Sequence, residues 1–294
     1  MSTTLTPPPA GTDAPPPAGG SPTRGSSRVI AILVIAFGAL VIAGAAVSAV
    51  WTTVSAASVQ TTSRTTAVTG VSDLDVDVSA GSLRIEFADV REAELEVTGT
   101  ADADRWTLER SGGTLSVASP DDWFTGGWRF GGWPFGDSGA GDAILRLPQS
   151  LEGVDADLSL SAGELVIADD ASFGEMQLQM SAGSARVEAS VDAVQVDVAA
   201  GSADVRLAGA REASFSVSAG SLEAELTGPQ PSAVSMQVSA GSLDVTVPDG
   251  EYDVRSDVSA GDFDNRIGST PGARSTVSVD VSAGKAILQA GSAR

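Results

Sequence analysis

Residues 74–87 read LDVDVSAGSLRIEF, and this stretch decides the fold because much of the remaining chain repeats its design. Apolar residues stand two apart on both sides of the glycine, at Leu74, Val76, Val78, Leu83, Ile85 and Phe87. Side chains two apart point to one face of a β-strand. Gly81 accepts backbone conformations that other residues avoid, and its neighbours Ser79 and Ala80 are small enough to stack. The stretch therefore predicts a strand, a Ser-Ala-Gly bend and a second strand.

The bend recurs with the regularity of a repeat protein. Its glycine stands at Gly81, Gly163, Gly183, Gly201, Gly220, Gly241, Gly261 and Gly284. After a first gap of 82 residues, the spacings are 20, 18, 19, 21, 20 and 23 residues. A unit of this length cannot bury its own apolar face, so units must stack on one another. We expect an all-β fold, a parallel β-solenoid in which glycine permits close backbone approach and helix is almost absent.

The first gap contains material outside the repeat. Strands are expected at 92–97, 106–109, 114–117 and 143–147, with a hairpin turn at Ser111-Gly112-Gly113. An aromatic loop is expected at 119–140, where residues 121–135 read DDWFTGGWRFGGWPF. Its candidate ligand or partner residues are Trp123, Phe124, Trp128, Phe130, Trp133 and Phe135. Such rings could stack on sugars, dip into a membrane or grip a protein, or they could cap the open end of the solenoid.

A second irregularity is expected near the C-terminus. Asn265 stands four residues after Gly261, where other units have Ile85, Val187 or Val245. A polar residue at a core position weakens the burial that holds a coil in the stack. The sequence therefore predicts an irregular coil there.

The N-terminal part of the chain predicts a membrane anchor. Residues 1–28 are rich in Pro, Gly and Ser and form a disordered cytoplasmic tail. Residues 29–51 carry no charge and are long enough to cross about 30 Å of hydrocarbon as one helix. Arg24 and Arg28 precede this helix, which places the N-terminus in the cytoplasm. A cleaved signal peptide ending near 55–57 is the alternative, although the apolar stretch is long for one.

The remaining residues are then extracytoplasmic. A juxtamembrane linker is expected at 52–67, followed by the repeat domain at 68–294. The chain as a whole is predicted to be a single-pass protein of the cell membrane.

Composition excludes several classes of chemistry. The chain has neither Cys nor His, so it can form no Ser-His-Asp triad, no histidine-based zinc site and no disulfide. Ser282 and Lys285 match an S-x-x-K pattern, but the repeat itself accounts for that Ser. Thirty-eight acidic against 17 basic residues give a net charge of −21, which disfavours nucleic acid as a partner. No cofactor is expected, although calcium is a cation that the abundant carboxylates could bind.

Abundant carboxylates leave one enzymatic alternative open. A glycosidase needs only two carboxylates across a cleft. The candidates are Asp75, Asp77, Asp155, Asp157, Glu223 and Glu225. They alternate with apolar positions, which favours a solvated outer face, and we predict that the protein is not an enzyme.

The repeats resemble the bacterial "putative adhesin" family, a domain of unknown function whose units end in Ser-Gly-Asp-like turns followed by an apolar strand. The equivalents here are Ser-Ala-Gly-Ser-Leu at Ser79, Ser218 and Ser239, and Ser-Ala-Gly-Asp-Phe at Ser259. Residues 144–148, ILRLP, are similar to the strand that precedes the family's repeat block. The resemblance covers about residues 68–290; it implies a solenoid and contributes no catalytic residue.

Two functions are consistent with these features. The first is a non-catalytic, membrane-anchored module that binds polymers of the cell envelope or another cell, as an adhesin does. The second is a structural or regulatory membrane protein that contacts other membrane proteins through its helix and through the edge strands of the solenoid.

Overall fold

The computed structural model describes residues 60–99, 103–120 and 141–291. The predicted tail at 1–28, the predicted membrane helix at 29–51 and the six aromatic candidates of the 119–140 loop lie outside these residues. Within the described ranges, no helix is long and apolar enough to span a membrane.

The described residues form an all-β structure, and the only helical segments in them are two single 3-10 turns. In chain order, the elements are β1 (Gln60–Thr66), β2 (Asp73–Val78), β3 (Ser82–Ala88), β4 (Ala93–Gly99), η1 (Ala103–Arg105), β5 (Thr107–Ser111), β6 (Thr114–Ala118), β7 (Asp142–Pro148), η3 (Gln149–Leu151), β8 (Val154–Leu160), β9 (Glu164–Met180), β10 (Ser184–Val198), β11 (Ser202–Ala208), β12 (Glu212–Val217), β13 (Ser221–Thr227), β14 (Ala233–Val238), β15 (Ser242–Val247), β16 (Tyr252–Val258), β17 (Asp262–Asn265), β18 (Ser275–Val281) and β19 (Lys285–Ala290). The strands predicted in the first gap are confirmed as β4, β5, β6 and β7. The predicted hairpin is also confirmed, because β5 and β6 pair antiparallel.

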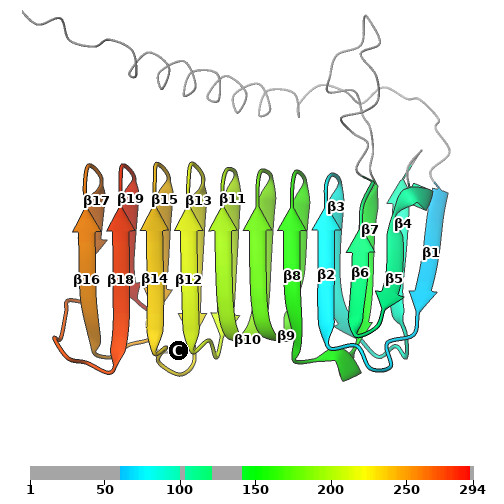
Figure 1. Ribbon diagram of the computed structural model, residues 1–294, viewed down its shortest axis with the longest axis horizontal. Helices are drawn as coiled ribbons and strands as arrows, with labels where there is room; N and C mark the ends of the chain where they lie inside the picture. The colour runs from blue at the N-terminus through cyan, green and yellow to red at the C-terminus, as the bar shows by residue number, and fades with distance from the viewer. Residues whose placement is uncertain (1–59, 100–102, 121–140, 292–294) are drawn as a thin grey trace, which may run out of the picture. The chain divides into compact units, whose positions relative to one another are not determined.

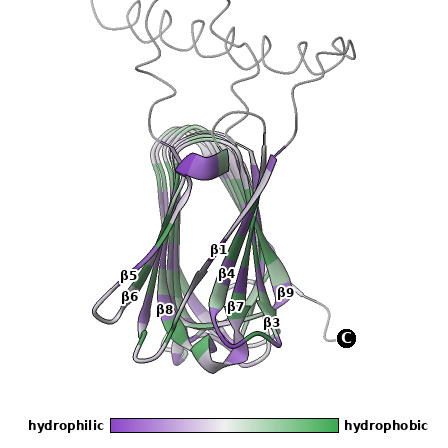
Figure 2. Cartoon of the chain, turned by 90° about the vertical axis from the view of Figure 1, so that its right-hand side faces the viewer, coloured by the Kyte–Doolittle hydropathy of each residue, from purple (hydrophilic) through white to green (hydrophobic). Residues whose placement is uncertain are grey.

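The strands form two layers that face each other (Figures 1 and 2). The pre-glycine layer contains the strands that precede the turn glycines together with β5 and β6, in the order β5-β6-β2-β8-β9-β10-β12-β14-β18-β16. The post-glycine layer contains the strands that follow the turn glycines together with β1, β4 and β7, in the order β1-β4-β7-β3-β9-β10-β11-β13-β15-β19-β17. The long strands β9 and β10 bend from the second layer into the first. Pairing is parallel throughout except at β1, β4 and β5.

A thin apolar core fills the space between the layers. Along each strand, buried apolar residues alternate with more exposed polar ones, as the period of two requires. In β11 the buried side chains are Ala203, Val205 and Leu207, and in register beside them β13 buries Leu222, Ala224 and Leu226. Full burial of one such Val or Leu side chain contributes about 1.5–3 kcal/mol, and the stack repeats that contribution in every coil.

The Ser-Ala-Gly turns stack along one edge of the layers. Apart from Gly261 in the terminal coil, each turn glycine carbonyl accepts a hydrogen bond from the neighbouring coil, as when Ser202 N–H donates to Gly183 O and Ser221 N–H donates to Gly201 O. Gly201 has a φ of +95°, but Gly220 is outside the positive-φ region. A Cβ on either glycine would collide with the glycine carbonyl of the preceding turn. Positive φ therefore explains only some of these glycines, whereas close stacking explains both.

The coils do not stack in the order in which they occur in the sequence. The last coil, β18 and β19, pairs with β14 and β15 on one side and with β16 and β17 on the other. Residues 252–265 therefore form the terminal coil, although residues 275–290 follow them (Figure 1). The first coil, β2 and β3, likewise has neighbours on both sides. Stacking of successive Ser-Ala-Gly units holds from Gly81 to Gly241 and is wrong at the C-terminal end, where the unit of Gly284 lies between those of Gly241 and Gly261.

The N-terminal end of the core is closed by structure that the sequence did not reveal. Strand β1 occupies residues 60–66, inside the segment expected as a linker, and pairs antiparallel with β4. Thr66 Oγ1 donates to Leu108 O at 3.3 Å, so β1 also contacts the opposite layer, across the end of the stack (Figure 2). Trp106, before β5, is fully buried in the core. The sequence of β1 is rich in Ser and Thr and has no apolar alternation, so the strand was not predicted; a strand at the end of the stack needs little apolar surface.

Candidate functional site

The outer face of the pre-glycine layer changes character along the stack. One row of outward side chains crosses β2, β8, β9, β10, β12, β14 and β18 at neighbouring register positions: Asp75, Asp157, Gln177, Gln195, Ser214, Ser235 and Ser278. The row therefore runs from carboxylates through amides to hydroxyls. The parts of these strands that lie in the pre-glycine layer contain no Arg or Lys, so their acidic side chains have no basic partner on the same strand segments.

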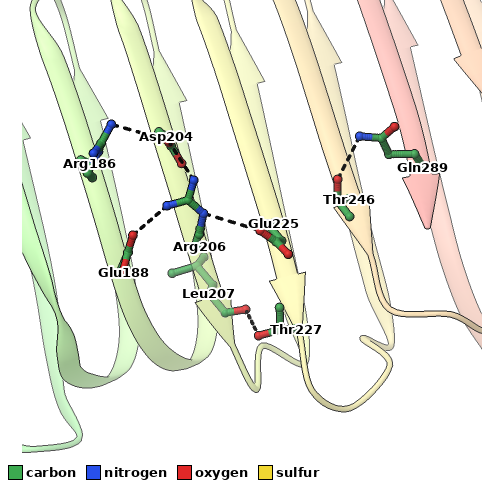
Figure 3. Close-up of polar contacts among 9 residues, drawn as sticks. All are labelled: Arg186, Glu188, Asp204, Arg206, Leu207, Glu225, Thr227, Thr246 and Gln289. Atoms are coloured by element: carbon green, nitrogen blue, oxygen red, sulfur yellow. Dashed lines mark hydrogen bonds and ion pairs between the residues drawn. The ribbon is translucent and has the colours of Figure 1, made fainter. Parts of the chain in front are cut away.

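The outer face of the post-glycine layer is different because several of its acidic groups are paired with arginines (Figure 3). Arg206 reaches Glu188 at 2.7 Å, Asp204 at 3.4 Å and Glu225 at 3.6 Å. These carboxylates, the hydrogen bond to Glu188 first among them, raise the pKa of Arg206. Such half-exposed pairs each contribute at most about 1 kcal/mol, and they offset part of the acidic charge of this face. The pre-glycine segments of β2, β8, β9, β10, β12, β14 and β18 have no such compensation.

Two shallow depressions adjoin on the outer face of the pre-glycine layer. The first, of about 430 Å³, lies over β2, β8 and β9 and is lined mainly by acidic side chains. The second, of about 340 Å³, lies over β9, β10 and β12 and is lined mainly by Gln and Ser. Gln177 lines both, which makes them one continuous surface. We take this surface, called here the polar depression, as the candidate functional site.

Register explains how the carboxylates of the polar depression come together. Parallel pairing places Asp73 beside Asp155 and Asp75 beside Asp157. Asp155 Oδ1 accepts a hydrogen bond from Glu175 N–H at 2.8 Å, which fixes it at the irregularity where β8 meets β9. All four carboxylates are exposed, and no group of acidic residues in the described ranges is arranged to hold a metal ion. The arrangement offers hydrogen-bond acceptors on an open surface.

The candidate carboxylates from the sequence separate between the two layers. Asp75, Asp155 and Asp157 lie at the polar depression, and Asp77 is on the same strand as Asp75. Glu223 and Glu225 lie instead on β13, on the opposite outer face. The amide and hydroxyl groups of the second depression were not singled out from the sequence. The sequence feature that could have identified them is the alternation of Gln and Ser with apolar residues in β9, β10 and β12, which predicts outward polar side chains.

The aromatic candidates lie outside the described residues, but the residues that flank them are placed. Ser119 Oγ accepts hydrogen bonds from the backbone N–H groups of Ser79 and Ala80, and Ser82 N–H donates to Gly141 O. Ala118 is in register with Asp77, and Asp142 with Ser82. Ser119 and Gly141, described residues on either side of the aromatic segment, thus lie beside the Ser-Ala-Gly bend of the neighbouring coil, at the edge where the turns stack.

Comparison with known proteins identifies a family over most of the chain. The model of the family described as Toastrack DUF4097 matches residues 71–286. No curated protein matches. A solved "putative cell adhesion protein" from Clostridium sporogenes is 9% identical, with a TM-score of 0.32, and the match covers 79% of this chain and all of that one. A "putative adhesin" from Bacteroides fragilis is 12% identical, with a TM-score of 0.38, and the match covers 78% and 97% of the two chains.

Proposed function

Because the chain belongs to the Toastrack DUF4097 family, a domain of unknown function, we propose a role from its surface: a non-catalytic, adhesin-like module that binds polymers of the cell envelope. We propose further that residues 29–51 anchor it in the cell membrane. The observation that carries the proposal is the polar depression. Its side chains repeat at the strand spacing of about 4.8 Å, so it offers a series of similar hydrogen-bonding groups. Such a series suits a chain of repeating units better than one small molecule.

The charge of the polar depression restricts the polymer. Carboxylates accept hydrogen bonds, and Gln and Ser both accept and donate them, so sugar hydroxyls find partners along the whole surface. Because the strand segments under the polar depression carry no Arg or Lys, phosphate-rich or otherwise anionic polymers are repelled. The part of the polymer that contacts this surface is therefore a neutral or positively charged glycan strand, including one that bears free amino groups.

The same surface supports a non-catalytic role. A glycosidase encloses its substrate between an acid and a base or nucleophile that stand on opposite sides of the bond that is cleaved. Here Asp75 and Asp157 stand side by side on neighbouring strands of one open face. They are placed to bind a polymer that lies over them and not to flank a bond.

The test is cosedimentation of the full chain, in detergent, with purified peptidoglycan sacculi. Gln177→Ala combined with Gln195→Ala removes amides from the polar depression, and Gln237→Ala, on the same face but outside it, is the matched control. Each lost hydrogen bond costs about 0.5–1.5 kcal/mol, so we expect the double variant to bind about tenfold more weakly and the control to bind normally. Equal retention of all three proteins, or none by the parent chain, would refute the proposal.

The aromatic residues need a separate experiment. Replacing Trp123, Trp128 and Trp133 by Ala should reduce retention on sacculi with unfolding unchanged if these rings contact the polymer. Reduced stability with retention intact would assign them to a cap.

A second candidate is a protein that acts through contacts with other proteins. The open strand edges at the C-terminal end of the layers favour it. Crosslinking in native membranes distinguishes the two candidates, because recovery of one defined partner protein supports the second.

A further inference from the structure

The C-terminal end of the stack is open, unlike the N-terminal end. Strand β16 pairs only with β18, and β17 pairs only with β19, so each has a free edge (Figure 1). The inward side chains of this coil are only partly covered: Val254 and Phe263 are half-buried, and Val258 is 41% exposed. Val258 is the only exposed large hydrophobic residue in the described ranges. An apolar interior that meets solvent between two free edges is a surface for pairing with another strand.

Part of the β16 edge is already occupied by the loop that follows β17. Ser269 Oγ accepts a hydrogen bond from Val254 N–H and donates one to Val254 O, and Thr270 N–H donates to Tyr252 O. Backbone groups of a strand alternate in direction, so those of Ser256 also point outward, and no hydrogen bond in the described structure engages them.

The β17 edge is free along its length. The N–H groups of Asp262 and Arg266 donate inward, to Gly284 O and Leu288 O. By the same alternation, the backbone groups of Phe263 and Asn265 point outward. Ser256 lies three residues before the turn at 259–261 and Asp264 lies three after it, so the two free edges stand at the same height.

We propose that this end pairs with the same end of a second copy of the chain, about a two-fold axis that passes between the copies at Ser256 and Asp264. Residues 254–258 read VRSDV, which is self-complementary when two such strands run antiparallel. With Ser256 opposite itself, Arg255 of each copy lies opposite Asp257 of the other. Val254 lies opposite Val258, whose backbone N–H and C=O then replace Ser269 Oγ as the hydrogen-bond partners of Val254. Opposite charges at directly facing positions stabilise antiparallel pairs. Asp257 has no ion pair within the described residues, so this pairing supplies one.

The same axis gives a matching arrangement in the other layer. With Asp264 opposite itself, Phe263 and Asn265 exchange backbone hydrogen bonds with the second copy, and Asp262 lies opposite Arg266. Asp262 also lacks an ion pair in the described structure. The two Asp264 side chains face each other, but each is already bound to Arg266 of its own chain at 2.8 Å. Val258 and Phe263 of both copies then close one shared core.

Two-fold symmetry limits this contact to a dimer, because it uses the same surface on both copies and leaves no free edge at their C-terminal ends. At the N-terminal end β1 runs across the stack, and that surface takes no part in the contact.

The test uses the absence of cysteine from the natural chain. Asp264→Cys places one thiol on the axis in a non-hydrogen-bonded pair, where Cα atoms lie about 4.5 Å apart, within the range for a disulfide. Asp244→Cys is the matched control, because Asp244 and Asp264 flank Ile287 at the same register position but β15 has neighbours on both sides. With the full chain in membranes and a mild oxidant, we expect a disulfide-linked dimer for Asp264→Cys only. Equal crosslinking of the two variants would overturn the proposal.

Charge exchange tests the register in the Asp264→Cys background. Arg255→Asp puts two carboxylates opposite each other on both sides of the axis, and we expect the dimer fraction to fall by about an order of magnitude. Arg255→Asp combined with Asp257→Arg restores opposite charges and should restore the dimer. If the double variant stays as low as the single one, β16 does not pair in this register.

Discussion

Replacing single turn glycines by alanine distinguishes the two physical reasons for glycine at a turn, a positive φ and the close approach of a neighbouring backbone. Gly228→Ala lowers the free energy of unfolding only through backbone strain, because Gly228 has a φ of +89° and the nearest atom to an added Cβ is 3.5 Å away. Gly220→Ala costs only the close approach, since its Cβ would lie 2.6 Å from Gly201 O. Gly201→Ala combines both, with a φ of +95° and a collision with Gly183 O.

The expected magnitudes follow from these contacts. A positive φ costs a residue with a Cβ about 1–2 kcal/mol. Relieving the collision at Gly220 pushes adjacent turns apart and strains the bond from Ser221 N–H to Gly201 O, at 2.9 Å, and a buried backbone group left unpaired costs about 1–3 kcal/mol. We therefore expect losses of about 1, about 2 and about 4 kcal/mol for Gly228→Ala, Gly220→Ala and Gly201→Ala.

Urea unfolding of the full chain, followed by the β-sheet circular dichroism band, measures these losses. Amide hydrogen exchange gives a local readout, because Ser221 N–H should lose protection in Gly220→Ala and keep it in Gly228→Ala. If Gly220→Ala is no less stable than Gly228→Ala, close stacking is not the reason for glycine at this turn, and our account of the repeat is wrong.

Three further predictions concern the ends and the outer face. Trp106→Ala removes a fully buried side chain at the N-terminal end and should cost about 3–5 kcal/mol in urea unfolding. Burial raises the pKa of Tyr252 to about 12, so its stabilising contribution is complete below pH 10 and disappears as pH rises through 12. Absorbance titration can follow this change directly because Tyr252 is the only tyrosine, and a midpoint near 10 would contradict it. Asp157→Asn relieves repulsion from Asp75 in the facing register and should stabilise the fold by a few tenths of a kcal/mol at low salt and less at high salt; an unchanged or reduced stability would exclude such repulsion.

Part of the polar depression could be predicted from the sequence pattern alone. Alternation identified Asp75, Asp155 and Asp157 as outward residues, because the period of two fixes the face of each residue from local sequence. It could not show that Asp75 and Asp157 are neighbours or that Glu225 lies on the opposite face, since these facts depend on which strands pair. The aromatic residues drew attention by composition alone, and composition gives no position.

The sequence by itself determined the repeating unit: the strand period, the bend at each Ser-Ala-Gly and the thin core between two layers. These follow from contacts within about 20 residues and from the requirement to bury one apolar face. Only the tertiary structure decided the order of the end coils, with β18 and β19 inside β16 and β17, and the closure by β1 and Trp106. The physical reason is that equivalent coils present nearly the same edge and the same inward Val and Leu, so local pattern does not distinguish one neighbour from another. Small differences between coils decide which one lies at the end of the stack. Ser256 and Asn265, at inward positions, are such differences, and their effect on stability depends on which coils are neighbours in the folded chain.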